Sequence, residues 1–324
     1  MSESLRQTIL KLLSEQDTYI SGQELSERLG VSRTAIWKHI SALKEKGYEI
    51  ESIPNKGYRL LNTPNRLIPE EILRNLKTTT LGKKIVFFEE IDSTNTQAKE
   101  SALDYPEGTI FLAEAQTKGR GRLGRSWSSI PGKGIWCSVL LKPSLDPTFA
   151  GQFPLLTAVA IAETFHNLGV DAKIKWPNDL LVDGKKICGI LTEMGAELDR
   201  INYLVIGFGI NVKHKLEDFP KEIRTIATSL EMVLKKEVDR VQLLCDILLK
   251  LEKYYFQLLK EGFEPIRKLW KEYTCTLGHE VKISRFNELP LFGKALDLNP
   301  DGSLLFELPD GQIINVHSGE IGLQ

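Results

Sequence analysis

The run GRGRLGRSW at residues 119–127 has the composition of an anion-binding loop. Its three arginines, Arg120, Arg122 and Arg125, alternate with glycines. Glycine lets backbone N–H groups come close to a ligand, and the guanidinium of arginine is a permanently charged planar fork that matches a phosphate. Three cations in one short loop repel each other. We therefore expect this loop to bind a polyphosphate and to become ordered with it.

Two familiar phosphate-binding motifs do not fit this run. Gly119, Gly121 and Gly124 spell GxGxxG, but the chain continues into the loop sequence SWSSIPG instead of a helix. The position about 20 residues further on, where a dinucleotide fold needs an acidic group, holds Ser144. No P-loop lysine follows a glycine at the required spacing. Spacing alone leaves a polyphosphate loop or a flexible nucleic-acid-binding loop.

The chain divides into three segments that together must position such a loop. In the first, residues 1–65, the sequence pattern predicts helices followed by a hairpin. Ser21 and Ser32 are N-cap residues for two amphipathic helices, and Gly30 ends the first of them. The short connection predicts a helix-turn-helix. In the run YEIESIPNKGYRLL, apolar and polar residues alternate on both sides of a turn, which indicates a β-hairpin wing.

The second segment, residues 66–270, follows a short linker at Thr63–Asn65 and mixes strands with helices. Strands are expected at FFEEI, TIFLAEA, GIWCSVLL, KIKW, LLV, KICGILTEM and YLVIGFGINV, and helices near 94–103, 151–168 and 237–260. The third segment, residues 271–324, has short apolar runs separated by two Asp-Gly turns, which predicts a small β-barrel.

Composition narrows the class of protein. With 324 residues, 42% hydrophobic and 26% charged, the chain has room for two or three folded domains. Its four cysteines form no CxxC pair, so the pattern favours neither a disulfide framework nor a zinc site. No signal peptide and no apolar run of about 20 residues is visible. We expect a cytoplasmic protein with no membrane partner.

The net charge of -1 means that any DNA contact must come from a local patch. The second helix of the helix-turn-helix supplies one, because its first turns carry basic and polar residues off the apolar face. Such a helix reads base edges in the major groove, and the wing can contact phosphates. A surface for protein contacts is the alternative. The candidate DNA-binding residues are Ser32, Arg33, Thr34, Trp37, Lys38, Lys56 and Arg59.

The run GRGRLGRSW resembles the adenylate-binding signature of biotin–protein ligases. The other landmarks of that family follow in the same order: DSTN at 92–95, Gln116, KWPND at 175–179, KICGIL at 186–191 and GFGINV at 207–212. The resemblance spans essentially the whole chain and is closest to the bifunctional, repressor-type ligases. It implies a multidomain α+β protein with a winged helix-turn-helix (1–65), a central mixed α/β ligase domain (66–270) and an SH3-like β-barrel (271–324).

The resemblance also implies the chemistry. Such enzymes activate biotin with ATP and Mg²⁺ to biotinyl-5'-AMP and transfer biotin to one lysine of a biotin carboxyl carrier domain of a carboxylase. The adenylate acts as corepressor: the homodimer that it promotes binds operator DNA. Two alternatives are a transcription factor that only senses a ligand, and a lipoate or octanoate transferase on the related fold. The arginine-rich loop argues against the second of these.

Residue roles follow from the same resemblance. Arg122 closes over biotin and phosphate, Lys186 neutralises the reacting groups, and Asp179 orients Lys186 or a magnesium ion. The expected biotin contacts are Ser93, Thr94, Asn95, Gln116, Gly119, Arg120, Gly121, Arg122, Trp127, Lys186 and Gly189. The expected ATP and adenylate contacts are Arg120, Arg122, Arg125, Asn178, Lys186 and Asn211. Some members cover the adenine with tryptophans after GIN; here Ile223 or Ile226 is expected instead.

Overall fold

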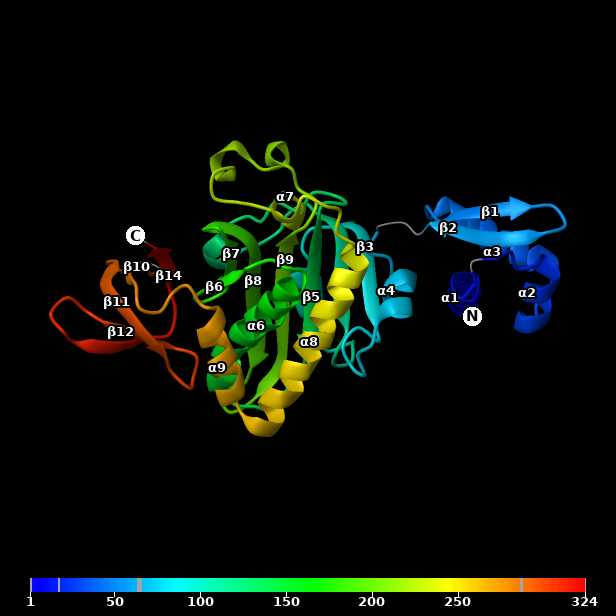
Figure 1. The fold of residues 1–324 in the computed structure, drawn as a ribbon. Helices are drawn as coiled ribbons and strands as arrows, with labels where there is room; N and C mark the ends of the chain where they lie inside the picture. The colour runs from blue at the N-terminus through cyan, green and yellow to red at the C-terminus, as the bar shows by residue number, and fades with distance from the viewer. Residues whose placement is uncertain (1, 17, 63–65, 286–287, 324) are drawn as a thin grey trace. The chain divides into compact units, whose positions relative to one another are not determined.

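The computed structural model describes residues 2–16, 18–62, 66–285 and 288–323, which form two compact units within residues 1–75 and 76–324 (Figure 1). The predicted linker Thr63–Asn65 lies outside the described residues. The domain boundaries at residues 65 and 270 stay predictions. None of the helices in the described ranges combines the length and apolar character needed to cross a bilayer.

The first unit confirms the predicted helices and wing. The Ser21 hydroxyl accepts from Glu24 N at 3.0 Å, and the Ser32 hydroxyl accepts from Ala35 N at 3.2 Å. Gly30 ends its helix at φ 64°, in the left-handed region that glycine tolerates. The elements are α1 (Ser2–Ser14), α2 (Gly22–Leu29), α3 (Arg33–Glu45), β1 (Glu49–Ile53), β2 (Gly57–Asn62) and α4 (Pro69–Asn75).

Helix α4, which the sequence patterns did not predict, packs within the first unit. Its carboxylates Glu70 and Glu71 are 1% and 2% exposed, so each needs a partner. Glu70 pairs with Lys46 at 2.5 Å, and Glu71 accepts from Tyr48 Oη at 2.7 Å and Arg74 at 2.6 Å. These contacts fix α4 to the end of α3 and the start of the wing.

The second unit is built on a seven-stranded sheet in the order β3-β4-β5-β9-β8-β7-β6. Only β3 and β4 pair in parallel; every other neighbouring pair is antiparallel. The strands are β3 (Ile85–Ile91), β4 (Ile110–Gln116), β5 (Gly134–Leu141), β6 (Lys173–Lys175), β7 (Asp179–Val182), β8 (Lys185–Ala196) and β9 (Ile201–Asn211). All seven predicted strands are confirmed.

Helices cover this sheet. The long helices α6 (Gln152–Asn167) and α8 (Arg240–Glu261) cross it in Figure 1, followed by α9 (Glu264–Tyr273). The short helix α5 (Thr94–Glu100) packs Ala98 against Phe111 and Val205. Three of these helices match the predicted helical segments, whereas α9 and the short α7 (Leu230–Leu234) were not anticipated.

The strands after α9 form a five-stranded antiparallel sheet in the order β13-β12-β11-β10-β14. Its members are β10 (Glu280–Ser284), β11 (Leu291–Leu298), β12 (Leu304–Glu307), β13 (Ile313–Val316) and β14 (Glu320–Leu323). This is the small β domain predicted at the C-terminal end, but among the described residues its sheet does not close into a barrel. The four-residue strands β13 and β14 are the open edges, each paired on one side only. Gly319 turns the chain between them at φ 155°.

Candidate active site

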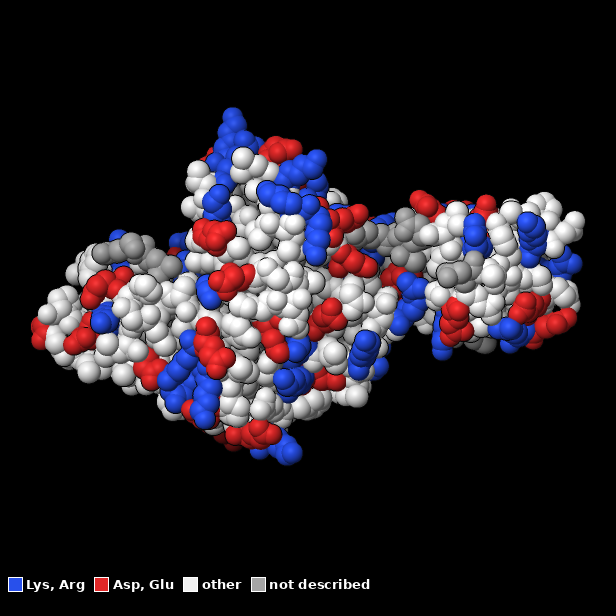
Figure 2. Space-filling model, viewed as in Figure 1, with Lys and Arg blue, Asp and Glu red and all other residues white. Residues whose placement is uncertain are grey.

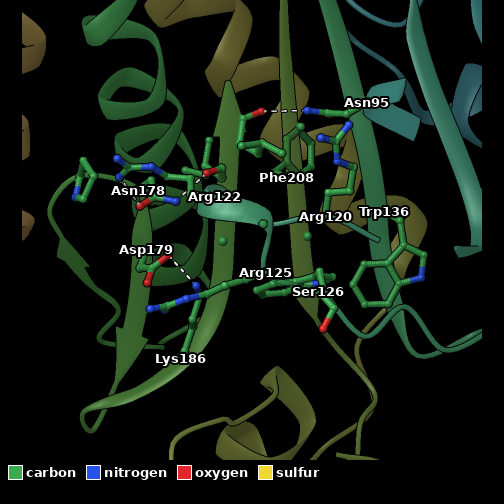
Figure 3. Close-up of a pocket in the computed structure, with 18 of the residues that line it drawn as sticks. Asn95, Arg120, Arg122, Arg125, Ser126, Trp136, Asn178, Asp179, Lys186 and Phe208 are labelled. Atoms are coloured by element: carbon green, nitrogen blue, oxygen red, sulfur yellow. Dashed lines mark hydrogen bonds and ion pairs between the residues drawn. The ribbon is translucent and has the colours of Figure 1, made fainter. Parts of the chain in front are cut away.

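A cavity of about 190 Å³ lies in the second unit, where the loop after β4 meets β5, β7, β8, β9 and the start of β14 (Figure 3). Thirteen predicted site residues line it: Ser93, Thr94, Asn95, Gln116, Arg120, Gly121, Arg122, Arg125, Trp127, Asn178, Asp179, Lys186 and Gly189. Residues far apart in the sequence thus share one site. In Figure 3, Asn95 and Arg120 lie on one side of it, opposite Asn178, Asp179 and Lys186.

Neutral polar groups at one side of the cavity bond to each other. Gln116 Oε1 accepts from Thr94 N at 2.8 Å and from Thr94 Oγ1 at 3.1 Å. Gln116 Nε2 donates to Ser129 Oγ at 2.8 Å. The buried Ser138 hydroxyl donates to Asn95 Oδ1 at 2.6 Å and lies 2.8 Å from Thr94 Oγ1. Hydroxyls and amides fixed in this way suit a ligand with both donors and acceptors.

The opposite side of the cavity carries charged side chains. Lys186 Nζ lies 2.7 Å from Asp179 Oδ1 and 5.3 Å from the centre of the Trp127 ring. Lys175 Nζ is 3.9 Å from the second Asp179 oxygen. The Lys186 backbone is held separately, because its N–H donates to Ile226 O at 2.7 Å and its carbonyl accepts from Thr228 N at 3.0 Å. The ammonium group is therefore placed by a strand and paired with a carboxylate.

The arginine loop is tied to two distant segments. Arg122 donates to Asn178 Oδ1 at 3.2 Å and to Gly319 O at 3.3 Å, and Arg125 forms an ion pair with Glu320. Burial lowers the pKa of Arg122, an effect that Glu320 and Asp179 oppose. Leu123, the first of the two residues between these arginines, has φ 54° and is 55% exposed. The loop is thus held by its arginines.

Three glycines keep the cavity open. A Cβ at Gly207 would lie 1.9 Å from Asn95 Oδ1, and one at Gly209 would lie 2.5 Å from Trp127 Nε1. A Cβ at Gly189 would meet the Trp127 ring at 2.8 Å. Their side-chain-free faces let Asn95 and Trp127 pack flat against the sheet, and all three glycines line the cavity.

Two predicted site residues do not line this cavity. Gly119 lies in the adjoining surface depression, where a Cβ would come within 2.3 Å of Trp127 O. Asn211 is buried, and its amide donates to Thr228 O at 3.1 Å. Their roles toward biotin and nucleotide stay predictions.

The loop between β9 and α7 carries the two residues expected over adenine. Ile226 is 58% exposed, and neither Ile223 nor Ile226 lines the cavity. Within the loop, Phe219 stacks on the buried His214 ring with 4.9 Å between centres, and burial lowers the pKa of His214 to about 4. Figure 2 shows Lys and Arg side chains on this projecting loop together with Asp and Glu side chains.

Residues at and next to the site that sequence reasoning missed include Lys99, Ser138, Glu193 and Glu320. Glu193 had a usable signal, because residues 189, 191 and 193 of one strand share a face. Ser138 is a polar residue in a strand that is buried along its whole length. Glu320 had none, since only the three-dimensional structure brings β14 to the cavity.

The first unit has its own groove, lined by the start of α2, by Arg33, Thr34 and Trp37 of α3, and by the wing turn at residues 52–58. Trp37 is 59% exposed there. Lys38 is exposed as well. On the wing, Arg59 pairs with Glu51 at 2.9 Å and lies 4.9 Å from the Tyr19 ring centre, and Lys56 lies 5.8 Å from the same centre. Ser32 is engaged as an N-cap.

Comparisons with known families agree with these two units. Residues 5–59 match the sequence model described as an HTH domain, and residues 87–211 match the Biotin/lipoate A/B protein ligase family. Residues 276–323 match the Biotin protein ligase C terminal domain. The fold and the site therefore define a helix-turn-helix protein that carries a biotin/lipoate ligase-type catalytic unit.

Full-length relatives narrow the class. The chain is 41% identical to the "Bifunctional ligase/repressor BirA" of Bacillus subtilis over 100% of both chains. It is 31% identical to the protein of that name from Escherichia coli over 94% of this chain and 92% of the relative. The biotin protein ligase of Aquifex aeolicus, solved with biotin and ATP, superimposes with a TM-score of 0.64 at 31% identity, covering 75% of this chain and 99% of that one. The chain belongs to the bifunctional ligase/repressor family.

Proposed function

We propose that the chain is a biotin–protein ligase and a DNA-binding repressor of biotin genes. It activates biotin with ATP to biotinyl-5'-AMP and transfers biotin to a lysine of a biotin carboxyl carrier domain. One observation carries the ligase function: a single cavity joins a neutral polar side, at Thr94 and Gln116, to a cationic side, at Lys186 and Arg122. The neutral side suits a cyclic urea, and the cationic side suits a carboxylate meeting a phosphate.

In the first half-reaction, a carboxylate oxygen of biotin attacks the α-phosphorus of ATP. The bond from that phosphorus to the bridging oxygen breaks, and pyrophosphate leaves with the electron pair. Charge gathers on the phosphoryl oxygens, so fixed cations should supply most of the catalysis. Lys186 lies on the strand that faces the expected position of the α-phosphate, and Arg122 closes the cavity. Asp179 keeps the Lys186 ammonium oriented at 2.7 Å.

Magnesium enters this scheme with ATP. Among residues 2–16, 18–62, 66–285 and 288–323, no group of three or more His, Cys, Asp or Glu side chains could hold a metal ion. A nucleotide-bound Mg²⁺ needs fewer protein ligands, since phosphates and water complete its shell. Asp179, with Asn178 beside it, is the acidic group that fits. A bound ion would neutralise phosphate charge.

The test of the ligase function is biotin-dependent exchange of labelled pyrophosphate into ATP, with Mg²⁺ and no carrier protein. We expect exchange, because adenylate formation is reversible on the enzyme. Folded protein that binds biotin without exchange would instead be a ligand-sensing transcription factor. Exchange that responds to lipoate and not to biotin would identify the transferase alternative.

In the second half-reaction, the amine of the carrier lysine attacks the acyl carbon of the anhydride, and AMP leaves. The adenylate must stay in the cavity until the carrier arrives, and Arg122 bridges the opening between Asn178 and Gly319. We predict that Arg122→Gly shortens the lifetime of bound biotinyl-AMP about tenfold or more, because two charge-assisted hydrogen bonds are lost. Bystander proteins should then become biotinylated on surface lysines.

The measurement is the half-life of labelled adenylate on the purified protein after rapid gel filtration. Leu123→Gly is the matched control, since it places a glycine in the same loop but removes an exposed side chain. If Leu123→Gly shortens the half-life as much as Arg122→Gly, loop stiffness rather than the guanidinium retains the adenylate.

The first unit is the repressor module. Its α3 presents Arg33, Thr34 and Trp37 along a groove bounded by the wing, the arrangement of a recognition helix. In this proposal the adenylate-bound chain forms a homodimer, whose two-fold axis places two such helices on the halves of a palindromic operator. Equilibrium sedimentation with biotin and ATP, compared with biotin alone, tests the dimer.

Trp37→Ala should weaken operator binding about tenfold, because an exposed indole on a recognition helix supplies apolar contact to base edges. Leu61→Ala is the control, since Leu61 is 54% exposed in the same unit but lies outside the groove. The assay is fluorescence anisotropy on DNA selected from a random library by the parent protein with biotin and ATP. Unchanged affinity in Trp37→Ala would remove Trp37 from the interface.

A further inference from the structure

The side-chain amide of Asn95 has almost no free hydrogen-bonding capacity. Its Nδ2 donates to Leu191 O at 3.1 Å and to Glu193 Oε2 at 3.1 Å. Its Oδ1 accepts from the Ser138 hydroxyl at 2.6 Å. A primary amide has two N–H donors and two acceptor lone pairs. Both donors are occupied, so one lone pair on Oδ1 is left.

The neighbours of Asn95 determine which way its amide faces. The carbonyl of Leu191 can only accept, and an ionised Glu193 can only accept, so the NH₂ group must point toward them. Oδ1 then lies against Gly207, where a Cβ would come within 1.9 Å of it. Asn95 and Gly207 both line the cavity. The remaining lone pair therefore belongs to the wall that a ligand contacts.

The charge on Glu193 is maintained by its surroundings. Its side chain is 19% exposed and lies 2.7 Å from Lys99 Nζ. Burial alone would raise the pKa of Glu193, but Lys99, the Asn95 amide and the charge of Arg120 outweigh it and hold the pKa below its usual range. The acceptor that orients Asn95 is thus a carboxylate held by a lysine.

We infer that Glu193, held by Lys99, is a positioning residue that turns the Asn95 carbonyl oxygen toward the cavity and so selects ligands with a ring N–H donor. A cyclic urea offers such a donor, and the dithiolane ring of lipoate offers none. A ring without the donor leaves the second lone pair of the buried Asn95 oxygen without a partner, which weakens binding. This inference rests on the proposed function, since biotin supplies the urea.

The experiment tests whether Glu193 affects the binding of one particular N–H group of the ligand. Two analogues of biotin are used, each a lactam in which one of the two urea N–H groups is replaced by CH₂. Dissociation constants for biotin and both lactams are measured by calorimetry on the parent and on Glu193→Gln. Glutamine keeps the shape of the side chain, but its amide can donate as well as accept, so Asn95 loses one of the two obligate acceptors that orient its amide and keeps only the Leu191 carbonyl.

We expect one lactam to bind the parent about tenfold or more weaker than biotin, and this penalty to shrink to less than about threefold in Glu193→Gln. Lys99→Met should act in the same direction as Glu193→Gln. Glu197→Gln, on an exposed carboxylate at the end of the same strand region, should leave the penalty unchanged. The KM for ATP in pyrophosphate exchange should stay within about twofold in Glu193→Gln, which a general loosening of the site would not allow.

Equal lactam penalties in the parent and in Glu193→Gln would overturn the inference, as would the absence of a penalty for either lactam in the parent. Failure of the proposed function looks different, because the parent would then not bind biotin. A Glu193→Gln protein that does not fold is replaced by Lys99→Met, which removes the charge that holds the carboxylate.

Discussion

Replacing Lys186 by methionine should reduce biotin-dependent pyrophosphate exchange about 100- to 1,000-fold, the loss expected when one fixed charge-stabilising group is removed from a reacting phosphoryl centre. Lys186 Nζ lies in the cavity at 2.7 Å from Asp179 and 5.3 Å from the Trp127 ring centre. Methionine keeps the length of the side chain and its packing on Trp127. It also keeps the backbone bonds to Ile226 and Thr228.

The adjacent residue provides the control. Lys185 lies on the same strand, is exposed, and does not line the cavity. Lys185→Met should exchange pyrophosphate within about twofold of the parent. Parallel measurement of biotin affinity separates binding from chemistry: we expect the affinity to change much less than the exchange rate. Equal losses in both variants would assign the effect to the strand, and full exchange in Lys186→Met would remove Lys186 from the reaction.

Local patterns predicted the elements that position this site. Ser21, Ser32 and Gly30 act through contacts within five residues in the chain, so their capping roles follow from residue type. The strands of the ligase sheet were visible because each is an apolar run with alternating or continuous burial. The order of the motifs along the chain then indicated the protein family and, through it, the residues of the cavity.

Contacts between distant segments were not predictable. The bond from Asn95 to Glu193 joins positions 98 residues apart, and the bond from Arg122 to Gly319 spans 197. Nothing in either local sequence marks its partner. The open edges of the last sheet were not predictable for the same reason. Whether β13 and β14 each pair on one side or on both depends on contacts between distant strands. Sequence patterns predicted the individual residues and strands of the site. Contacts between distant segments determine how those residues are held in place.

A buried ion pair between Arg240 and Glu114 also restrains the second unit. Arg240 of α8 is 1% exposed and contacts both oxygens of Glu114 on β4, at 3.1 and 3.3 Å. It also donates to Gly134 O at 3.0 Å, and Glu114 accepts from Gly132 N at 3.2 Å. The pair thereby fixes the start of β5, the strand that brings Trp136 and Ser138 to the site.

Arg240→Met should lower the free energy of unfolding of the second unit by about 3–5 kcal/mol, because it leaves the Glu114 carboxylate buried without its countercharge. For a unit of this size each kcal/mol corresponds to about 2–4 °C in Tm. Urea denaturation followed by tryptophan fluorescence measures the change. Arg200→Met is the control: Arg200 forms an exposed pair with Glu197 and should cost less than about 0.5 kcal/mol.

A double variant separates two explanations of that loss. If the cost comes from burying the Glu114 charge without Arg240, adding Glu114→Leu to Arg240→Met should recover most of the stability, since an apolar pair of similar volume is often as stable as a buried ion pair. If the cost comes from the contacts that Arg240 and Glu114 make to the backbone at Gly134 and Gly132, the double variant should be no more stable than the single one. In that case pyrophosphate exchange should also fall, because the start of β5 would no longer hold its strand against the cavity.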